Sequence, residues 1–206
     1  MKLYNVAYSG NSYKVRLLLA QLGLVCEIIE VDILKGESRT PEFLKINPNG
    51  RTPVLDDDGF VLAESNAILG YLARGTKFLP EHRQRWAQVF QWLFFEQYSH
   101  EPYIAVARFF EIHPEHQDDR RAGLPRIMKN GYDALGVMES HLSGAGEGDH
   151  PRDYFVGGKY SIADIALYAY THVAHEGGFD LSNYPAIQSW LARVKSQPRH
   201  IPITQA

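Results

Sequence analysis

The pattern of apolar and polar positions over the first eighty residues is typical of short strands that alternate with helices. Four short apolar segments have the length and residue types of strands. They are Lys2–Ala7, Cys26–Val31, Pro53–Leu55 and Phe60–Leu62. Because the last two flank a turn-forming sequence rich in aspartate and glycine, we predict that they form a hairpin.

The segments between these predicted strands have the residue spacing and capping residues of helices. Apolar residues before Gly23 recur at intervals of three and four, which predicts an amphipathic helix that ends at this glycine. Thr40 and Pro41 have the residue types of an N-cap and a first helical position, so we expect a short helix that ends near Ile46. A third helix is expected to begin at Ser65. The resulting order, βαβαββα, is that of a small α/β module.

The second part of the chain carries only helical patterns. Strand signals stop near residues 75–83, and four helices are expected after them, the first with a kink at Pro102. We therefore predict a chain of class α/β plus all-α, with a first domain at residues 1–76 and an all-helical domain at residues 83–206.

Composition and charge are those of an ordinary globular protein. The chain has 206 residues, of which 45% are hydrophobic, and its 21 basic and 24 acidic side chains give a formal net charge of −3. Proteins that bind nucleic acids usually carry an excess of basic side chains on one face, and this slightly negative net charge does not indicate one. No apolar run reaches the roughly 18 residues that cross a membrane, and the first residues lack the apolar core of a signal peptide. We therefore expect a cytoplasmic protein without a nucleic-acid or membrane partner.

The single cysteine, Cys26, excludes an intrachain disulfide, a CxxC motif and a cysteine-rich zinc site. We expect Cys26 to be a buried core thiol. The pair His113 and His116 stands beside Pro114 without further ligands, so we expect surface histidines and no metal. If this protein performs sulfur chemistry, the sulfur must come mainly from a ligand.

The first candidate site residues lie in the turn between the first predicted strand and the first predicted helix. Ser9 and Ser12 have the spacing of a CxxC motif with hydroxyls in place of thiols, and Asn11 lies between them. A helix N-terminus favours an anion. A hydroxyl or amide that donates to a thiolate lowers the thiol pKa below its ordinary value of about 8.5. The simpler alternative is that Ser12 caps the helix and Ser9 is a turn residue.

Two further clusters have residue types that suit the charged ends of a small ligand. Glu64 and Ser65 stand at the start of the third helix, where a carboxylate can bind to a hydroxyl and free N–H groups and an ammonium to the acidic side chain. Arg51 precedes Thr52 and Pro53, and a cis bond there would leave the Thr52 backbone to pair with an extended ligand. The alternatives are a plain capped helix and an exposed arginine in a turn.

These clusters, in their order and spacing, resemble the glutathione transferase family over the whole chain. The resemblance also rests on the TPVL segment from Thr52, the capping box Ser161–Asp164 and the helix Tyr184–Trp190. It implies an N-terminal thioredoxin-like βαβαββα domain, followed by a C-terminal helical bundle that forms the pocket for the acceptor substrate. The first turn is similar to that of the bacterial nu- and theta-like classes, although the nu-like sequence Thr-Pro-Asn-Gly is here Ser9-Gly10-Asn11-Ser12.

The resemblance implies a site for glutathione as co-substrate, without a metal. Glu64 and Ser65 match the pair that holds the γ-glutamyl group. Thr52, before the expected cis-proline Pro53, matches the residue whose backbone pairs with the cysteinyl unit. Basic groups approach the glycyl carboxylate at the positions of Arg51 and Lys35.

Ser9, Asn11 and Ser12 all remain open as the group that stabilises the thiolate. On the acceptor side, the resemblance points to Tyr103 and Arg108, with core packing as the alternative for the aromatic residues of that helix.

The implied function is an enzyme that activates the glutathione thiol and conjugates it to a hydrophobic electrophile, as in detoxification. One alternative is a glutathione-dependent disulfide-bond reductase, which the nu-like Asn11 suggests. A second alternative is a non-catalytic transferase-like scaffold, against which the combination of Arg51, Glu64 and Ser65 argues. Family members usually form homodimers.

Overall fold

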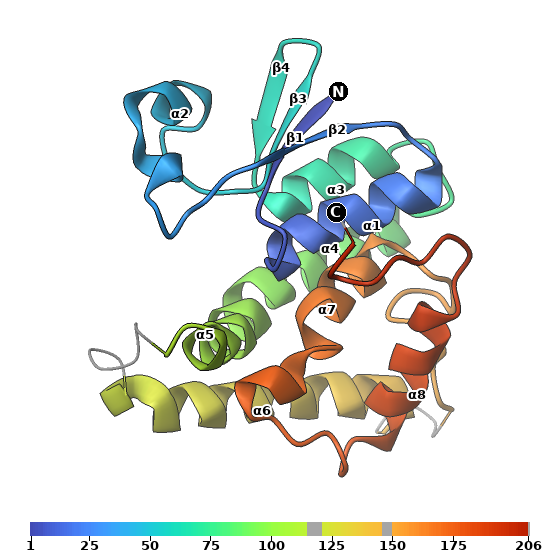
Figure 1. Cartoon of the computed structure of the whole chain (residues 1–206). Helices are drawn as coiled ribbons and strands as arrows, with labels where there is room; N and C mark the ends of the chain where they lie inside the picture. Colours follow the sequence, from blue (N-terminus) through green and yellow to red (C-terminus); the bar gives the residue numbers. More distant parts are fainter. Residues whose placement is uncertain (115–120, 146–149, 206) are drawn as a thin grey trace. The chain divides into compact units, whose positions relative to one another are not determined.

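Four strands of the computed structural model, which describes residues 1–114, 121–145 and 150–205, form one mixed sheet in the order β2-β1-β3-β4 (Figure 1). The strands are β1 (Lys2–Asn5), β2 (Glu27–Glu30), β3 (Val54–Asp57) and β4 (Phe60–Ala63). β1 pairs in parallel with β2, and β3 pairs antiparallel with β1 and β4, so the predicted hairpin is confirmed. Leu3 and Leu55 are register partners and fully buried, so this face of the sheet carries a core.

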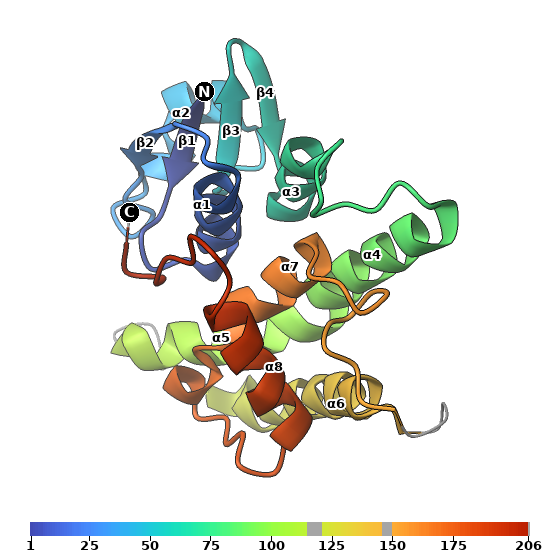
Figure 2. The same ribbon diagram turned by 90° about the vertical axis from the view of Figure 1, so that its right-hand side faces the viewer.

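Three helices accompany the sheet, and each begins or ends at a residue that the sequence indicated. They are α1 (Gly10–Leu22), α2 (Pro41–Ile46) and α3 (Ser65–Ala73), with a short 3-10 helix, η1 (Glu37–Arg39), before α2. Gly23 ends α1 because its φ of +69° is a left-handed conformation that glycine adopts without strain. Thr40 caps α2, since its hydroxyl oxygen accepts the N–H of Phe43 at 3.3 Å. α1 and α3 lie side by side (Figures 1 and 2).

The chain divides into two compact units whose limits differ from the predicted domains at the C-terminal end. Unit 1 comprises Met1–Thr76 together with the residues from Pro198 onward, and unit 2 comprises Lys77–Gln197. The prediction assigned all of residues 83–206 to the helical domain, because nothing in the local pattern separates the last residues from the helix before them.

Two residues of α1 hold the C-terminal segment in unit 1. The Tyr13 hydroxyl donates to the carbonyl oxygen of Ile201 at 2.7 Å. The Arg16 guanidinium donates to the carbonyl oxygen of Ile203 at 2.7 Å and to Asn5 Oδ1 at 3.0 Å. Because Tyr13 and Arg16 are themselves buried, these bonds make the end of the chain part of the first unit.

The regular secondary structure in the described residues of unit 2 is helical, apart from one isolated bridge between Val156 and Lys159. Its longer helices are α4 (Arg83–Phe95), α5 (Glu101–Ile112), α6 (Leu124–Ser143), α7 (Ile162–Thr171) and α8 (Pro185–Lys195), and its shorter ones are η2 (Glu96–His100), η4 (Arg121–Gly123) and η5 (Ala174–Gly177). α7 is buried along its whole length and contacts α4, α5 and α8, so it is a central packing element of this unit. Among the described helices, none combines the length and hydropathy needed to cross a membrane.

A π-helical segment, η2, interrupts the first long helix of unit 2 just before Pro102. Proline has no N–H, so Pro102 cannot close the α-helical hydrogen bond to the carbonyl of Tyr98. The Glu101 N–H bonds the carbonyl oxygen of Glu96, five residues back, which is the π-helical pattern. The predicted disturbance of this helix at Pro102 is therefore present as a change of helix type.

Asp164 joins three segments of unit 2 through its buried carboxylate. Its Oδ2 accepts the N–H and the hydroxyl of Ser161 at 2.9 and 3.1 Å, which completes the predicted capping box of α7. Its Oδ1 accepts the Phe155 N–H at 3.1 Å and the indole N–H of Trp190 at 3.0 Å. Burial raises the pKa of this carboxyl to about 6, against the opposing effect of the four hydrogen bonds.

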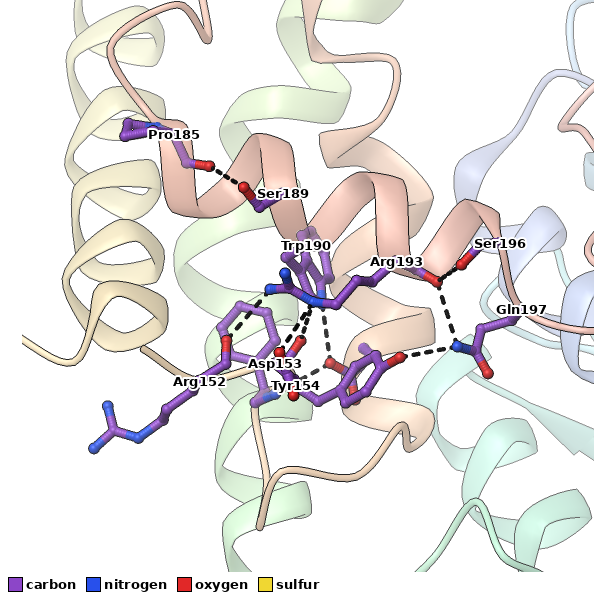
Figure 3. Close-up of polar contacts among 11 residues, drawn as sticks. Arg152, Asp153, Tyr154, Pro185, Ser189, Trp190, Arg193, Ser196 and Gln197 are labelled. Atoms are coloured by element: carbon purple, nitrogen blue, oxygen red, sulfur yellow. Dashed lines mark hydrogen bonds and ion pairs between the residues drawn. The ribbon is translucent and has the colours of Figure 1, made fainter. Parts of the chain in front are cut away.

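Figure 3 shows the side of α8 that meets residues 152–154. Arg193 Nε donates to the carbonyl oxygen of Asp153 at 3.0 Å and lies 3.7 Å from its carboxylate. The Gln197 amide donates to the Tyr154 hydroxyl at 2.9 Å. These contacts lie near Trp190 and hold α8 against the segment that leads into Phe155.

Gly131 lies where α6 packs against Phe179. A Cβ on Gly131 would lie 2.4 Å from Cζ of the Phe179 ring, so Gly131→Ala forces the ring or the helix to move. We expect it to lower the free energy of unfolding by about 2 kcal/mol. Gly136→Ala in the same helix is the matched control, since no atom lies within 4 Å of its added Cβ. Alanine's helix propensity should there raise stability by up to about 1 kcal/mol. Urea denaturation measures both variants, and equal losses would contradict this packing.

Cys26 does not lie in the core, contrary to the prediction. It is half-buried just before the edge strand β2, and its Sγ lies 3.7 Å from the carbonyl oxygen of Glu27. An edge strand is covered on one side only, which is why apolar neighbours did not imply full burial. Burial raises the pKa of this thiol, so little of it is present as the reactive thiolate at neutral pH.

Candidate functional site

Ser9 caps α1 at the turn after β1. Its backbone is extended, with φ −74° and ψ 126°, and its Oγ accepts the Ser12 N–H at 3.3 Å. The capping alternative drawn from the sequence named Ser12 as the cap; the cap is Ser9, and Ser12 lies within α1. Because Ser9 Oγ is the acceptor in this bond, its hydroxyl proton can still be donated. The first turn of α1 has no acidic residue, so the positive end of the helix dipole is not neutralised there.

Ser12 is turned into the interior of unit 1. Its side chain has an exposed fraction of 0%, and its Oγ accepts the N–H of Val6 at 3.2 Å. This bond ties the end of the first strand segment to the first turn of α1. The hydroxyl is therefore placed for folding, away from any surface where a ligand could meet it.

Asn11, Lys14 and Ser65 are joined pairwise by three hydrogen bonds, which form a triangle between α1 and α3. Lys14 Nζ donates to Asn11 Oδ1 at 2.8 Å and to Ser65 Oγ at 3.3 Å. The Ser65 hydroxyl donates to Asn11 Oδ1 at 3.2 Å. Lys14 and Ser65 are buried, and Asn11 is half-buried. The structure thus joins two clusters that the sequence kept separate, through a lysine that sequence reasoning missed.

The start of α3 combines an unusual backbone with first-turn N–H groups that the N-cap side chain does not bond. Glu64 precedes the helix with φ +71° and ψ 113°, a conformation that costs a non-glycine residue about 1–3 kcal/mol. No side chain caps α3, and its first turn has no acidic residue. The Glu64 side chain is exposed while Ser65 points toward Lys14. Strain of this kind is typical of ligand-binding positions.

The peptide bond between Thr52 and Pro53 is cis, as predicted. Pro53 is buried and Thr52 is half-buried directly before β3, while Arg51 is exposed. The side-chain amide of Asn47 donates to the Arg51 carbonyl oxygen at 2.8 Å and so supports this loop. Arg39, which the sequence did not single out, donates to the carbonyl oxygen of Asn49 at 2.9 Å.

Lys35 is exposed in the turn after β2 and pairs with Asp32 at 3.0 Å. The hydrogen bond between them raises the pKa of Lys35 and lowers that of Asp32. Exposed ion pairs of this kind contribute little to stability, so the pair does not prevent Lys35 from meeting another anion.

The two residues expected on the acceptor side lie in α5 of unit 2. Tyr103 is half-buried. Arg108 is buried, and its Nε lies 2.6 Å from a carboxylate oxygen of Glu176 in η5. Gly177 follows, and a Cβ there would lie 2.7 Å from the Arg108 backbone nitrogen, so α5 and η5 are in close contact. Arg108 therefore has a structural role in holding these two elements together.

The chemistry that unit 1 offers is the binding of anionic groups. Two helix N-termini with no acidic residue in their first turns meet at Asn11 and Ser65, and a buried ammonium group lies between them. Within the described ranges, no three His, Cys, Asp or Glu side chains are placed to hold a metal ion. His113 is half-buried at the end of α5, and His116 lies outside the described residues.

Comparison with protein families identifies both parts of the chain. Residues 1–74 match the glutathione S-transferase N-terminal domain, and residues 102–198 match the glutathione S-transferase C-terminal domain. The predicted fold class, a thioredoxin-like α/β domain followed by a helical domain, is confirmed.

Individual relatives agree with these matches. A glutathione S-transferase from Pseudomonas fluorescens shares 55% identity, with a TM-score of 0.93 over 99% of this chain and 98% of that one. The disulfide-bond oxidoreductase YfcG of Escherichia coli is 32% identical over 93% of this chain and 89% of its own. The glutathione transferase URE2P8 of Phanerochaete chrysosporium, solved with oxidized glutathione, shares 30% identity and a TM-score of 0.83 over 96% and 90% of the two chains. The chain therefore belongs to the glutathione S-transferase family and is a transferase enzyme.

Proposed function

We propose that unit 1 binds glutathione at the triangle of Asn11, Lys14 and Ser65, and that the enzyme joins its sulfur to a hydrophobic electrophile. The observation that carries the proposal is the meeting of two helix N-termini, each with no acidic residue in its first turn, at a buried ammonium group. Glutathione has two carboxylates and a thiol, so such a site suits its anionic groups. The oxidized glutathione bound to the Phanerochaete relative supports the same ligand.

The γ-glutamyl end of glutathione is assigned to the start of α3. Its carboxylate would accept from the Ser65 hydroxyl and from N–H groups of the first turn, which the N-cap side chain does not bond. Its ammonium would pair with the exposed carboxylate of Glu64. The positive φ of Glu64 supports this assignment, because strained backbone persists where a ligand site needs it.

The rest of glutathione is assigned to the loop before β3 and the turn after β2. The backbone of Thr52, which precedes the cis-proline Pro53, would pair with the cysteinyl unit. Arg51 and Lys35 are exposed cations that can reach a glycyl carboxylate by side-chain movement, Arg51 from the same loop.

Asn11 is the residue we assign to the thiolate, with Ser9 as the second donor. Asn11 is half-buried at the first turn of α1, and Ser9 keeps a hydroxyl proton to donate. Ser12, whose buried hydroxyl serves the Val6 N–H, is not assigned to the reaction. Ser9→Gly tests the Ser9 hydroxyl cleanly, because glycine at an N-cap costs only a few tenths of a kcal/mol.

The reaction follows from a lowered thiol pKa. The thiolate sulfur attacks an electrophilic carbon, a carbon–sulfur bond forms, and the leaving group departs with the bonding electrons. Tyr103 is the polar group of unit 2 that we assign to the acceptor, since the Arg108 guanidinium is engaged by Glu176. Detoxification of such electrophiles is the expected role, in the cytoplasm.

Disulfide-bond reduction is the second candidate, favoured by the similarity to the Escherichia coli oxidoreductase. In that reaction the glutathione thiolate attacks a disulfide sulfur and releases one thiol. A second glutathione thiolate then releases the other thiol and forms oxidized glutathione. Comparing turnover of an aryl halide with that of a small hydroxyalkyl disulfide separates the two. Activity on the halide alone supports conjugation, activity on the disulfide alone supports reduction, and inactivity on both would contradict the proposal.

We also propose a homodimer, because aromatic side chains are exposed on both units. Trp86, Phe94 and Tyr98 follow one face of α4 and η2, with exposed fractions of 45, 71 and 83%, and Phe60 in β4 has 52%. Exposed aromatic groups of this kind are typical interface anchors. Phe94→Ser is expected to weaken dimerisation by about 2 kcal/mol, roughly 30-fold. Sedimentation velocity measures the change, and a wild-type protein that stays monomeric would contradict the proposal.

A further inference from the structure

Lys14 is a buried residue of α1, and we infer that it is the positioning residue that orients Asn11 toward the glutathione thiolate, an inference that rests on the proposed function. Its side chain has an exposed fraction of 0%. Burying an ammonium group is costly unless polar partners surround it. Two of its polar partners are Asn11 Oδ1 at 2.8 Å and Ser65 Oγ at 3.3 Å, on two different helices.

The chemistry of lysine fixes the orientation of the Asn11 amide. An ammonium group donates hydrogen bonds and accepts none, so the Asn11 atom at 2.8 Å must be the carbonyl oxygen. The oxygen and nitrogen of an amide diverge from the same carbon. Because the Asn11 amide oxygen accepts from Lys14, the amide nitrogen and its N–H donors point away from Lys14, and we assign the thiolate to that position.

Ser65 cannot hold Asn11 in this way once glutathione is bound. Its hydroxyl has one proton, which is donated to Asn11 Oδ1 at 3.2 Å. The proposed function uses that same proton for the γ-glutamyl carboxylate. Lys14 has three protons and can donate to Asn11 and Ser65 together. Lys14 thus keeps the thiolate donor in place while Ser65 turns to the ligand.

The test is the pKa of the thiol of bound glutathione, read from thiolate absorbance at saturating glutathione. Lys14→Met removes the ammonium and should raise this pKa by about one unit, the equivalent of a tenfold loss of thiolate. Lys2→Met, at an exposed lysine of the same unit, is the matched control and should leave it unchanged. In an Asn11→Ala background, Lys14→Met should add almost no further shift, because its effect passes through Asn11.

The outcomes separate this inference from the function on which it rests. A wild-type protein that binds glutathione without lowering its thiol pKa would overturn both. If the thiol pKa of bound glutathione is lowered in the wild type and equally lowered in Lys14→Met, the positioning role of Lys14 is overturned and the proposed function stands. If Lys14→Met still raised the thiol pKa by about one unit in the Asn11→Ala background, the positioning role of Lys14 would also be overturned. If Lys14→Met does not fold, Lys14→Gln replaces it. The glutamine side chain is one bond shorter than lysine, so its amide does not reach Asn11, and the same rise in the thiol pKa of bound glutathione is expected.

Discussion

Asp164→Ala is expected to lower the free energy of unfolding by about 4 kcal/mol, a large part of the ~5–15 kcal/mol that stabilises a typical domain. The substitution removes the acceptor for three buried N–H donors, those of Ser161, Phe155 and the Trp190 indole. Each orphaned donor costs about 1–3 kcal/mol, and relaxation of the surrounding segments recovers part of the sum.

Asp153→Ala is the control for this variant. Asp153 lies near the same segment, but its carboxylate is exposed and 3.7 Å from Arg193, so its loss should change stability by less than about 1 kcal/mol. Urea denaturation at pH 7 measures both variants. Similar losses for Asp153→Ala and Asp164→Ala would show that the buried carboxylate has no special role.

The pH dependence of stability tests the burial of Asp164 independently. Folding raises its pKa from 3.8 to about 6, so between these values the native state binds more protons than the unfolded state. The contribution of this group is full below pH 3.8 and is lost as the pH rises through 6, by up to ~3 kcal/mol. Asp164→Asn lacks this titration, so the advantage of the wild type over it should shrink between pH 4 and pH 7. A constant difference would contradict the raised pKa.

Ser65→Ala should weaken glutathione binding by about 10- to 100-fold, because a hydrogen bond to a charged group contributes about 1.5–3 kcal/mol. The backbone N–H groups of α3 remain, so binding is weakened rather than abolished. Isothermal titration calorimetry gives the dissociation constant. The thiol pKa of the glutathione that still binds should change little, since Lys14 continues to hold Asn11.

Ser189→Ala provides the control for the loss of a serine hydroxyl. Ser189 is exposed on α8, where its hydroxyl donates to the Pro185 carbonyl oxygen at 2.9 Å (Figure 3). It should leave affinity unchanged. Unchanged affinity in Ser65→Ala would reject the assignment of the γ-glutamyl carboxylate to α3.

Elements with local signals were predictable from the sequence. Thr40 and Pro41 stand next to each other at the start of α2, and Gly23 directly ends α1, so the residues that decide these boundaries are neighbours in the chain. The capping box of α7 spans only Ser161 to Asp164 and was predictable for the same reason.

Features that depend on distant residues were not predictable in this way. A lysine within a helix is expected to face solvent, and only folding brings Ser65, 51 residues later, against Lys14. Arg108 likewise meets Glu176, 68 residues later. The roles of Ser9 and Ser12 were undecided because both residues suit an N-cap, and the choice depends on which hydroxyl meets the Val6 N–H inside the unit.

The thiol pKa of glutathione bound to the wild-type protein, compared with that in Asn11→Ala, tests directly whether this enzyme stabilises the glutathione thiolate through Asn11. A free thiol of this kind has a pKa of about 8.5. We expect the wild-type complex to titrate at least about one unit lower, and the Asn11→Ala complex to return most of the way to the free value. A bound thiol that titrates like free glutathione in the wild-type protein would contradict the account.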